Sequence, residues 1–139
     1  MNFYKKLLQF IDQPFKEGGI GPGGYDCLGL IGRVQESLGK EFPHSFEDID
    51  EQNYSELYKA DRVGAEEKLI QFLTSFCKEI PTSAMKPGDI ILVKSHKNGF
   101  RFPGIYVGNM NYITSFSDAG VKVFPLASDK VELLKAWRL

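Results

Sequence analysis

The chain has 139 residues, a length that suits one domain and allows a core to form without disulfides or metal. Hydrophobic residues make up 42% and charged residues 25%, as in ordinary globular proteins, and the formal net charge is -1. This balance gives no electrostatic reason to expect nucleic acid or an anionic membrane as a partner. No stretch approaches the ~20 apolar residues of a membrane span. We therefore expect a single domain over residues 1–139.

The chain contains two cysteines, Cys27 and Cys77. A disulfide framework in a secreted protein would usually use more, so both are expected to be free thiols. The N-terminus has basic residues but no apolar run long enough for a signal peptide. We therefore expect synthesis and folding in the cytoplasm, and export as part of a larger particle would need no such peptide. We expect no cofactor and no metal site.

The first third of the chain is predicted to be helical around a glycine-rich loop. Apolar residues at helical spacing between Tyr4 and Ile11 predict a short helix that ends before Pro14. Residues 18–24 include five glycines and predict a loop of unusual backbone freedom.

A second helix is predicted directly after this loop. Asp26 is a good N-cap, and apolar side chains recur at i, i+4, i+7 and i+11 from Cys27 until Gly39 closes the helix. Gly29 and Gly32 each weaken such a helix by about 1 kcal/mol relative to alanine. This cost is tolerable where another element packs closely against them.

The middle of the chain predicts a loop and two more helices. Residues 40–53 are polar and aromatic, which indicates a loop. Helical patterns follow over residues 54–60 and 65–80. Cys77 extends the apolar face of the second pattern, so we interpret it as a small core residue.

The last third predicts antiparallel strands joined by short turns. The strands are expected over residues 90–93, 100–107, 112–116 and 121–126, with an edge strand over residues 136–139. Asn98-Gly99 is the strongest hairpin signal in the chain. Helices followed by an antiparallel meander indicate an α+β fold with the helices on one face of the sheet.

Cys27 is a candidate nucleophile because of its place at the start of a helix. A thiol there lies among unpaired backbone N–H groups and at the positive end of the dipole, which favours the thiolate and lowers the pKa. The same N–H groups could form an oxyanion hole. On its own this pattern is not specific, since a free cysteine on a helix face is usually a packing residue.

The residues around Cys27 resemble a known motif. Residues 24–30, GYDCLGL, are similar to the nucleophile motif of NlpC-type peptidases, the papain-like cysteine hydrolases of bacterial cell walls. Further segments resemble that family in the same order: residues 39–43 (GKEFP), 86–92 (KPGDIIL) and 104–109 (GIYVGN), with Pro14-Phe15, Gly18-Gly19, Gly120-Val121 and Trp137-Arg138 fitting the compact version found in phage tails.

This resemblance covers nearly the whole chain and carries specific expectations. It implies a papain-like NlpC-type fold in which the cysteine helix and other N-terminal helices pack on an antiparallel C-terminal sheet. It also implies that Cys27 is the catalytic position, with Tyr25 and Asp26 beside it. The cleft would hold a peptide or peptidoglycan-like ligand, or a protein partner.

Two positions depart from the family pattern. The general base of the family is a histidine at the place of Phe102, and the polar residue that orients it is commonly a histidine at the place of Thr114. Leu28 replaces the usual serine or tryptophan, which is a minor change. A phenylalanine cannot accept a proton, and positioned general acid–base catalysis is worth about 10²–10⁴-fold in rate.

Another histidine could in principle replace the missing base. If residues 98–99 are the two turn residues of the hairpin, His96 pairs with Arg101 and points to the face opposite that of Phe102. A one-residue bulge would reverse this orientation. His44 lies in the loop after the cysteine helix, where we expect a surface residue.

Three interpretations follow. The chain is an active cell-wall cysteine hydrolase with Cys27 and an unusual base, His96 or His44; or a pseudoenzyme that binds a peptide or protein in the old cleft; or a structural component of a phage-like tail. The retained cysteine favours the first, whereas Phe102 and Thr114 favour the others. We interpret the chain as a relative of peptidoglycan peptide hydrolases that is catalytically weak or inactive.

Overall fold

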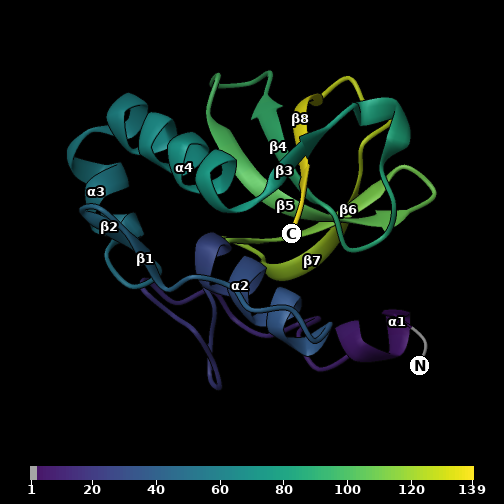
Figure 1. Cartoon of the computed structure of the whole chain (residues 1–139), viewed down its shortest axis with the longest axis horizontal. Helices are drawn as coiled ribbons and strands as arrows, with labels where there is room; N and C mark the ends of the chain where they lie inside the picture. Colours follow the sequence, from purple (N-terminus) through teal and green to yellow (C-terminus); the bar gives the residue numbers. More distant parts are fainter. Residues whose placement is uncertain (1–2) are drawn as a thin grey trace.

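The computed structural model describes residues 3–139 and has the expected α+β architecture (Figure 1). The helices are α1 (Phe3–Leu7), α2 (Cys27–Ser37), α3 (Tyr54–Ala60), α4 (Arg62–Phe76) and the 3-10 turn η1 (Thr82–Ala84). The strands are β1 (Ser45–Phe46), β2 (Ile49–Asp50), β3 (Lys78–Ile80), β4 (Ile90–Ser95), β5 (Arg101–Gly108), β6 (Asn111–Phe116), β7 (Gly120–Pro125) and β8 (Val131–Arg138).

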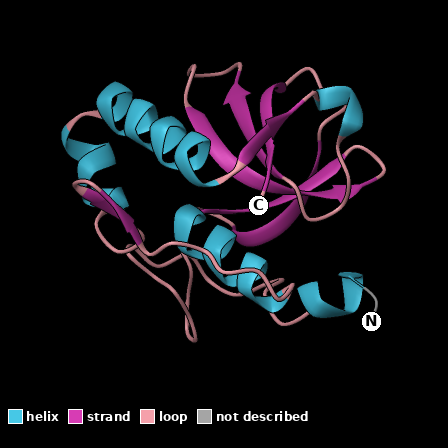
Figure 2. Cartoon of the chain, viewed as in Figure 1, coloured by secondary structure: helices cyan, strands magenta, loops and turns pink. Residues whose placement is uncertain are grey.

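The six longer strands, β3 to β8, form one antiparallel sheet in the order β3-β8-β4-β5-β6-β7. Figure 2 shows the α-helices gathered beside this curled sheet. The main core lies between the helices and the sheet, where α2 packs on β5 and β6 through buried side chains such as Leu28, Ile31 and Ile113. A second, smaller core lies on the other face and joins β3, β4, β6 and β8, including Val93 and Tyr112. The sheet therefore buries residues on both faces.

Helix α2 begins and ends close to where the sequence predicts. Asp26 is the N-cap, and its carboxylate accepts a hydrogen bond from the N–H of Gly29. Gly39 follows the helix with a φ of 79°, a left-handed conformation that glycine adopts without strain. The prediction that Cys27 lies in the first turn of a helix is confirmed. Helix α3 also has the predicted bounds.

The prediction of one helix over residues 65–80 is wrong at both ends. Helix α4 starts at Arg62 because Asp61 caps it by accepting from the N–H of Gly64. It stops at Phe76, since Cys77 is in an extended conformation and the next three residues form β3, which pairs with β8. Cys77 is nevertheless buried, as expected of a core residue.

Two further strand predictions need correction. The C-terminal strand is longer than residues 136–139, and it is not an edge strand: β8 lies between β3 and β4. The edge that β8 was expected to form is taken by β3, which lay inside the predicted helix. The predicted loop over residues 40–53 contains the small β1–β2 hairpin.

The register of the β4–β5 hairpin also differs from the expectation. Val93 pairs with Phe102, so the pairing of His96 with Arg101 is wrong. The N–H of Ser95 donates to the carbonyl oxygen of Phe100, and this bond leaves residues 96–99 as the turn. His96 therefore belongs to the loop, and the strand alternation on which its orientation was predicted does not apply to it.

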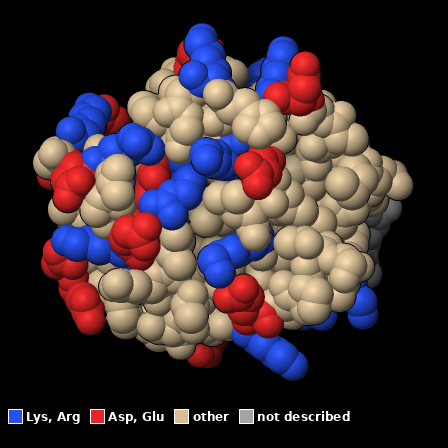
Figure 3. All heavy atoms as spheres, turned by 90° about the horizontal axis from the view of Figure 1, so that it is seen from above, with Lys and Arg blue, Asp and Glu red and all other residues tan. Residues whose placement is uncertain are grey.

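The surface carries charges of both signs. Figure 3 shows Lys and Arg side chains interspersed with Asp and Glu on the face that it presents. Within residues 3–139, no helix is both long and apolar enough to cross a bilayer.

Candidate functional site

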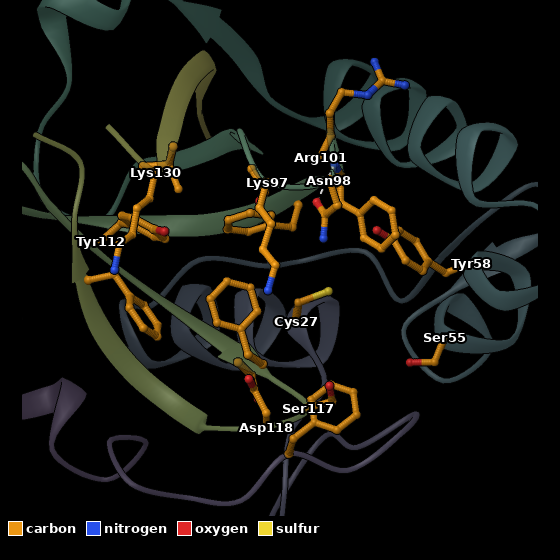
Figure 4. A pocket seen from close by; sticks show the side chains of 18 of the residues that line it. Cys27, Ser55, Tyr58, Lys97, Asn98, Arg101, Tyr112, Ser117, Asp118 and Lys130 are labelled. Carbon is orange, nitrogen blue, oxygen red and sulfur yellow. Dashed lines mark hydrogen bonds between the residues drawn. The ribbon is translucent and has the colours of Figure 1, made fainter. Parts of the chain in front are cut away.

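Cys27 lines a pocket of about 1180 Å³ between the helices and one end of the sheet. Its walls come from the segment before the glycine-rich loop, α3, the β4–β5 hairpin, the β6–β7 turn and the loop before β8. Figure 4 shows Cys27 in this pocket, below Lys97 and Asn98 of the hairpin and beside Tyr58 of α3. Phe102 lines the same pocket. The fold therefore brings these two predicted site positions together.

Asp26 fixes the start of the cysteine helix. Its side chain is fully buried and accepts hydrogen bonds from the N–H groups of Gly29 (2.7 Å) and Gly18 (3.0 Å) and from the Ser55 hydroxyl (3.4 Å). Burial raises the pKa of Asp26 to about 6, although the backbone hydrogen bonds act in the opposite direction. Asp26 thus joins the glycine-rich loop, α2 and α3, and it is a positioning residue for Cys27.

The glycines near Cys27 allow close backbone packing. A Cβ atom on Gly29 would lie 2.0 Å from the carbonyl oxygen of Gly19. The N–H of Asp26 donates to that same oxygen at 3.1 Å. Only glycine fits at position 29, because the glycine-rich loop packs directly against the first turn of α2. This is the close packing that we expected from the glycines of this helix.

Tyr25 serves the core and does not line the pocket. Its side chain is 9% exposed and its ring makes an edge contact with Phe10, with the centroids 5.5 Å apart. Its carbonyl oxygen accepts a hydrogen bond from the Ser115 hydroxyl at 2.8 Å. This bond ties the residue before the helix cap to β6, so Tyr25 acts on the site through its backbone.

The expectation of a lowered pKa at Cys27 is wrong in direction. Burial raises the pKa of the Cys27 thiol well above its ordinary value, and the neighbouring Asp26 carboxylate raises it further. A hydrogen bond from the Leu28 N–H favours the thiolate but does not outweigh them. Among the described residues no cation contributes to this balance. The thiol is therefore protonated at neutral pH, and a catalytic cycle would need a base to remove its proton.

Phe102 belongs to a contiguous group of aromatic rings in the pocket. Its ring centroid lies 4.9 Å from that of Phe116 and 6.2 Å from that of Tyr112. Phe124 continues the group at 5.1 Å from Phe116 and 5.8 Å from Tyr112. We call these four residues the aromatic wall. None of the four side chains is basic at neutral pH, so this side of the pocket offers apolar contact in place of a proton acceptor.

Thr114 does not line the pocket. It is fully buried, and its hydroxyl donates to the carbonyl oxygen of Pro103 at 2.9 Å. Thr114 is thus hydrogen-bonded to the backbone of Pro103, the residue that follows Phe102. By strand alternation it lies on the same face of β6 as Tyr112 and Phe116, and its hydrogen bond holds β6 to β5.

The two histidines occupy different regions. His96 lines the pocket, and its Nδ1 atom lies 2.6 Å from the carbonyl oxygen of Asp129. His44 lies between the carboxylates of Glu51 (3.6 Å) and Glu36 (4.0 Å) and is not among the described residues that line the pocket. Of the two proposed replacement bases, only His96 is therefore near the site.

Tyr54 is a pocket residue that the sequence did not reveal. It is 2% exposed, and its hydroxyl oxygen has no hydrogen-bond partner among the described residues. Burial raises the pKa of Tyr54, and the nearby Cys27 raises it further. A buried hydroxyl without a protein partner is unusual, and it gives this part of the pocket a polar group. The first residue of a short helix gives no local signal of such a role.

The fold agrees with a comparison to known proteins. Residues 12–133 match the NlpC/P60 family, and the chain belongs to that family. No curated protein sequence matches the chain.

Solved structures with similar folds include NlpC/P60 domains of several kinds. The NlpC/p60 domain of the peptidoglycan hydrolase SagA has 19% identity and a TM-score of 0.63, over 99% of this chain and 96% of that one. RipD from Mycobacterium tuberculosis, described as a non-catalytic NlpC/p60 domain protein adapted to peptidoglycan binding, has 17% identity and a TM-score of 0.56, over 99% and 94%. A Bacillus cereus NlpC/P60 family protein has 18% identity and a TM-score of 0.64, and this chain covers only 38% of its length.

Proposed function

We propose that this chain is a peptide-binding NlpC/P60 domain that takes peptidoglycan-type peptides in the Cys27 pocket and hydrolyses them weakly or not at all. The observation that carries the proposal is that Phe102, at the position where the family resemblance requires a histidine, lines the same pocket as Cys27. The raised pKa of Cys27 supports it, because a protonated thiol without a base is a poor nucleophile.

A precedent within the family supports the same proposal. RipD, which shares this fold, is described as non-catalytic and adapted to peptidoglycan binding. A pocket of about 1180 Å³ has room for a short peptide, and its aromatic wall offers apolar contact surface. Loss of the base would abolish catalysis in such a pocket, but the shape and the polar groups that bind a peptide would remain.

An active hydrolase with His96 as its base is the second candidate. His96 lines the pocket, and the contact of Nδ1 with a carbonyl oxygen requires that this nitrogen carry the proton. The neutral ring then has Nε2 as a proton acceptor, which is the arrangement of an oriented catalytic histidine. Nε2 lies 3.9 Å from a carboxylate oxygen of Glu132, a residue that does not line the pocket.

Binding and cleavage measured on the same samples distinguish the two candidates. The probe is the tetrapeptide L-Ala–γ-D-Glu–L-Lys–D-Ala, with binding followed by calorimetry and cleavage by mass spectrometry. The proposal expects saturable binding, no more than trace cleavage, and unchanged binding by Cys27→Ala. Robust cleavage that is abolished by Cys27→Ala and by His96→Ala would establish the second candidate. Absence of binding to the wild-type domain would refute the first.

A further inference from the structure

We infer that the pocket holds its ligand by a free carboxylate, which Lys97 and Lys130 bind at the rim beside the aromatic wall. This inference rests on the proposed function and specifies its ligand as a peptide with an ionised carboxyl group at that end of the pocket. The ligand class follows from charges, hydrogen bonds and the direction of side chains.

The two lysines differ from the other cations of the pocket because they have no partner. Lys59 forms an ion pair with Glu17, and Arg101 donates to two carboxylates of α4, each at 2.9 Å. Lys97 and Lys130 form no ion pair with any described residue. Figure 4 shows both side chains extending into the pocket, whereas the guanidinium of Arg101 points away from Cys27. The unpaired charges are therefore the ones that a ligand would meet.

His96 holds the two lysine-bearing loops together. Its N–H donates to the carbonyl oxygen of Lys130 at 2.9 Å, and its ring contacts the carbonyl oxygen of Asp129 at 2.6 Å. Lys97 directly follows His96, so the two lysines start from neighbouring points of backbone. This arrangement places the backbones of the two lysines next to each other, at the same side of the pocket.

The acidic residues of the pocket do not cancel this charge. Among the residues that line this side, Asp129 offsets one of the two lysine charges and leaves one positive charge in excess. Glu132, which lies 3.9 Å from the His96 ring, does not line the pocket. Asp118 lies on the opposite side, in the β6–β7 turn, as Figure 4 shows. The pocket therefore has a positive side and an acidic side, and an acidic group of the ligand is favoured at the first.

The aromatic wall adjoins the positive side and explains why a peptide fits there. Phe124 and Phe102 line the pocket together with Val131, the residue after Lys130. A methyl group or the methylene groups of a peptide side chain would contact these rings, while the neighbouring carboxylate would reach the lysines. Apolar contact and charge together select such a ligand over a free small anion.

The test compares one peptide in two chemical forms. The probes are the tetrapeptide L-Ala–γ-D-Glu–L-Lys–D-Ala and the same peptide with both carboxyl groups converted to carboxamides. Wild-type protein should bind the carboxylate form at least about fivefold more tightly at low salt, as expected for partly exposed ion pairs. The double variant K97Q/K130Q should lose that preference. It should bind both peptides with the affinity that the wild-type protein has for the carboxamide form. Raising the salt concentration should reduce the preference of the wild-type protein.

A matched control separates a local effect from a change in net charge. K78Q/K86Q removes two exposed lysines that do not line the pocket, and it should keep the wild-type preference. Equal binding of the two peptides by the wild-type protein, or a preference that survives in K97Q/K130Q, would overturn the carboxylate site and leave the proposed function standing. If neither peptide binds, the proposed function itself fails and the inference fails with it.

Discussion

The carboxylate of Asp26 accepts a hydrogen bond from the backbone N–H of Gly29 at 2.7 Å, inside a fully buried environment. This bond closes the first turn of the helix that carries Cys27. Asp26→Ala should therefore lower the free energy of unfolding by about 1–2 kcal/mol, as for other lost N-caps. Asp26→Asn keeps a side-chain oxygen in place and should lose less. Urea denaturation of the three proteins measures both changes, and equal stability of wild type and Asp26→Ala would contradict this role.

The same residue should make stability depend on pH. The pKa of Asp26 is about 6 in the folded protein and 3.8 for an unperturbed aspartate, so the folded state holds the proton more tightly. Its contribution to stability is fully present below about pH 4, decreases as the pH rises towards 6, and is constant above that. A shift of this size corresponds to about 3 kcal/mol. The free energy of unfolding is measured against pH for the wild type and for Asp26→Asn, and the difference between the two curves isolates this decrease. A difference that does not change with pH would refute it.

Gly29→Ala should destabilise the protein despite the higher helix propensity of alanine. The new Cβ would lie 2.0 Å from the backbone oxygen of Gly19. Because that oxygen belongs to the backbone, no side-chain rotation can remove the clash. We expect a loss of about 1–3 kcal/mol, typical of overpacking. Gly32→Ala is the comparison in the same helix, because its Cβ would meet side chains and not backbone: the Glu51 carboxylate at 2.4 Å and the Phe42 ring at 3.0 Å. Thermal denaturation should rank Gly29→Ala clearly below Gly32→Ala, and the reverse order would count against the packing described.

Cys27 should react slowly with alkylating reagents at neutral pH. Burial and Asp26 raise its pKa, so the reactive thiolate is scarce, and we expect a rate at least about tenfold below that of a model thiol. Burial also raises the pKa of Cys77, to about 11, so it should be slow as well. Brief labelling with iodoacetamide at several pH values, followed by peptide mapping, measures both rates. A Cys27 that reacts faster than free cysteine at pH 7 would show a stabilised thiolate and favour an active enzyme.

Restoring one histidine should not restore hydrolysis. In Phe102→His the new imidazole would lie among the rings of Phe116 and Tyr112, without a polar partner to fix its tautomer. We expect a larger gain from Phe102→His combined with Thr114→His, with non-additive effects because the two groups act as a unit. Circular dichroism should accompany the activity assay, since Thr114 is fully buried. Full activity of Phe102→His alone would contradict the need for an orienting partner.

The sequence by itself determined the features that depend on short stretches of chain. The cap at Asp26, the start of α2 at Cys27, the bounds of α3 and the family assignment all follow from local spacing and motifs. Such signals act over one or two helical turns, or in a tight turn, and need no knowledge of distant residues.

Only the tertiary structure decided the features that depend on distant contacts. The end of α4 and the place of β8 inside the sheet both result from the pairing of β3 with β8, more than 50 residues away. This pairing competes with local helix propensity. The position of His96 depends on a hairpin register that differs by two residues from the simplest turn. The direction of the pKa shift at Cys27 was decided in the same way, because burial by the rest of the fold outweighs the favourable helix terminus that the sequence reveals.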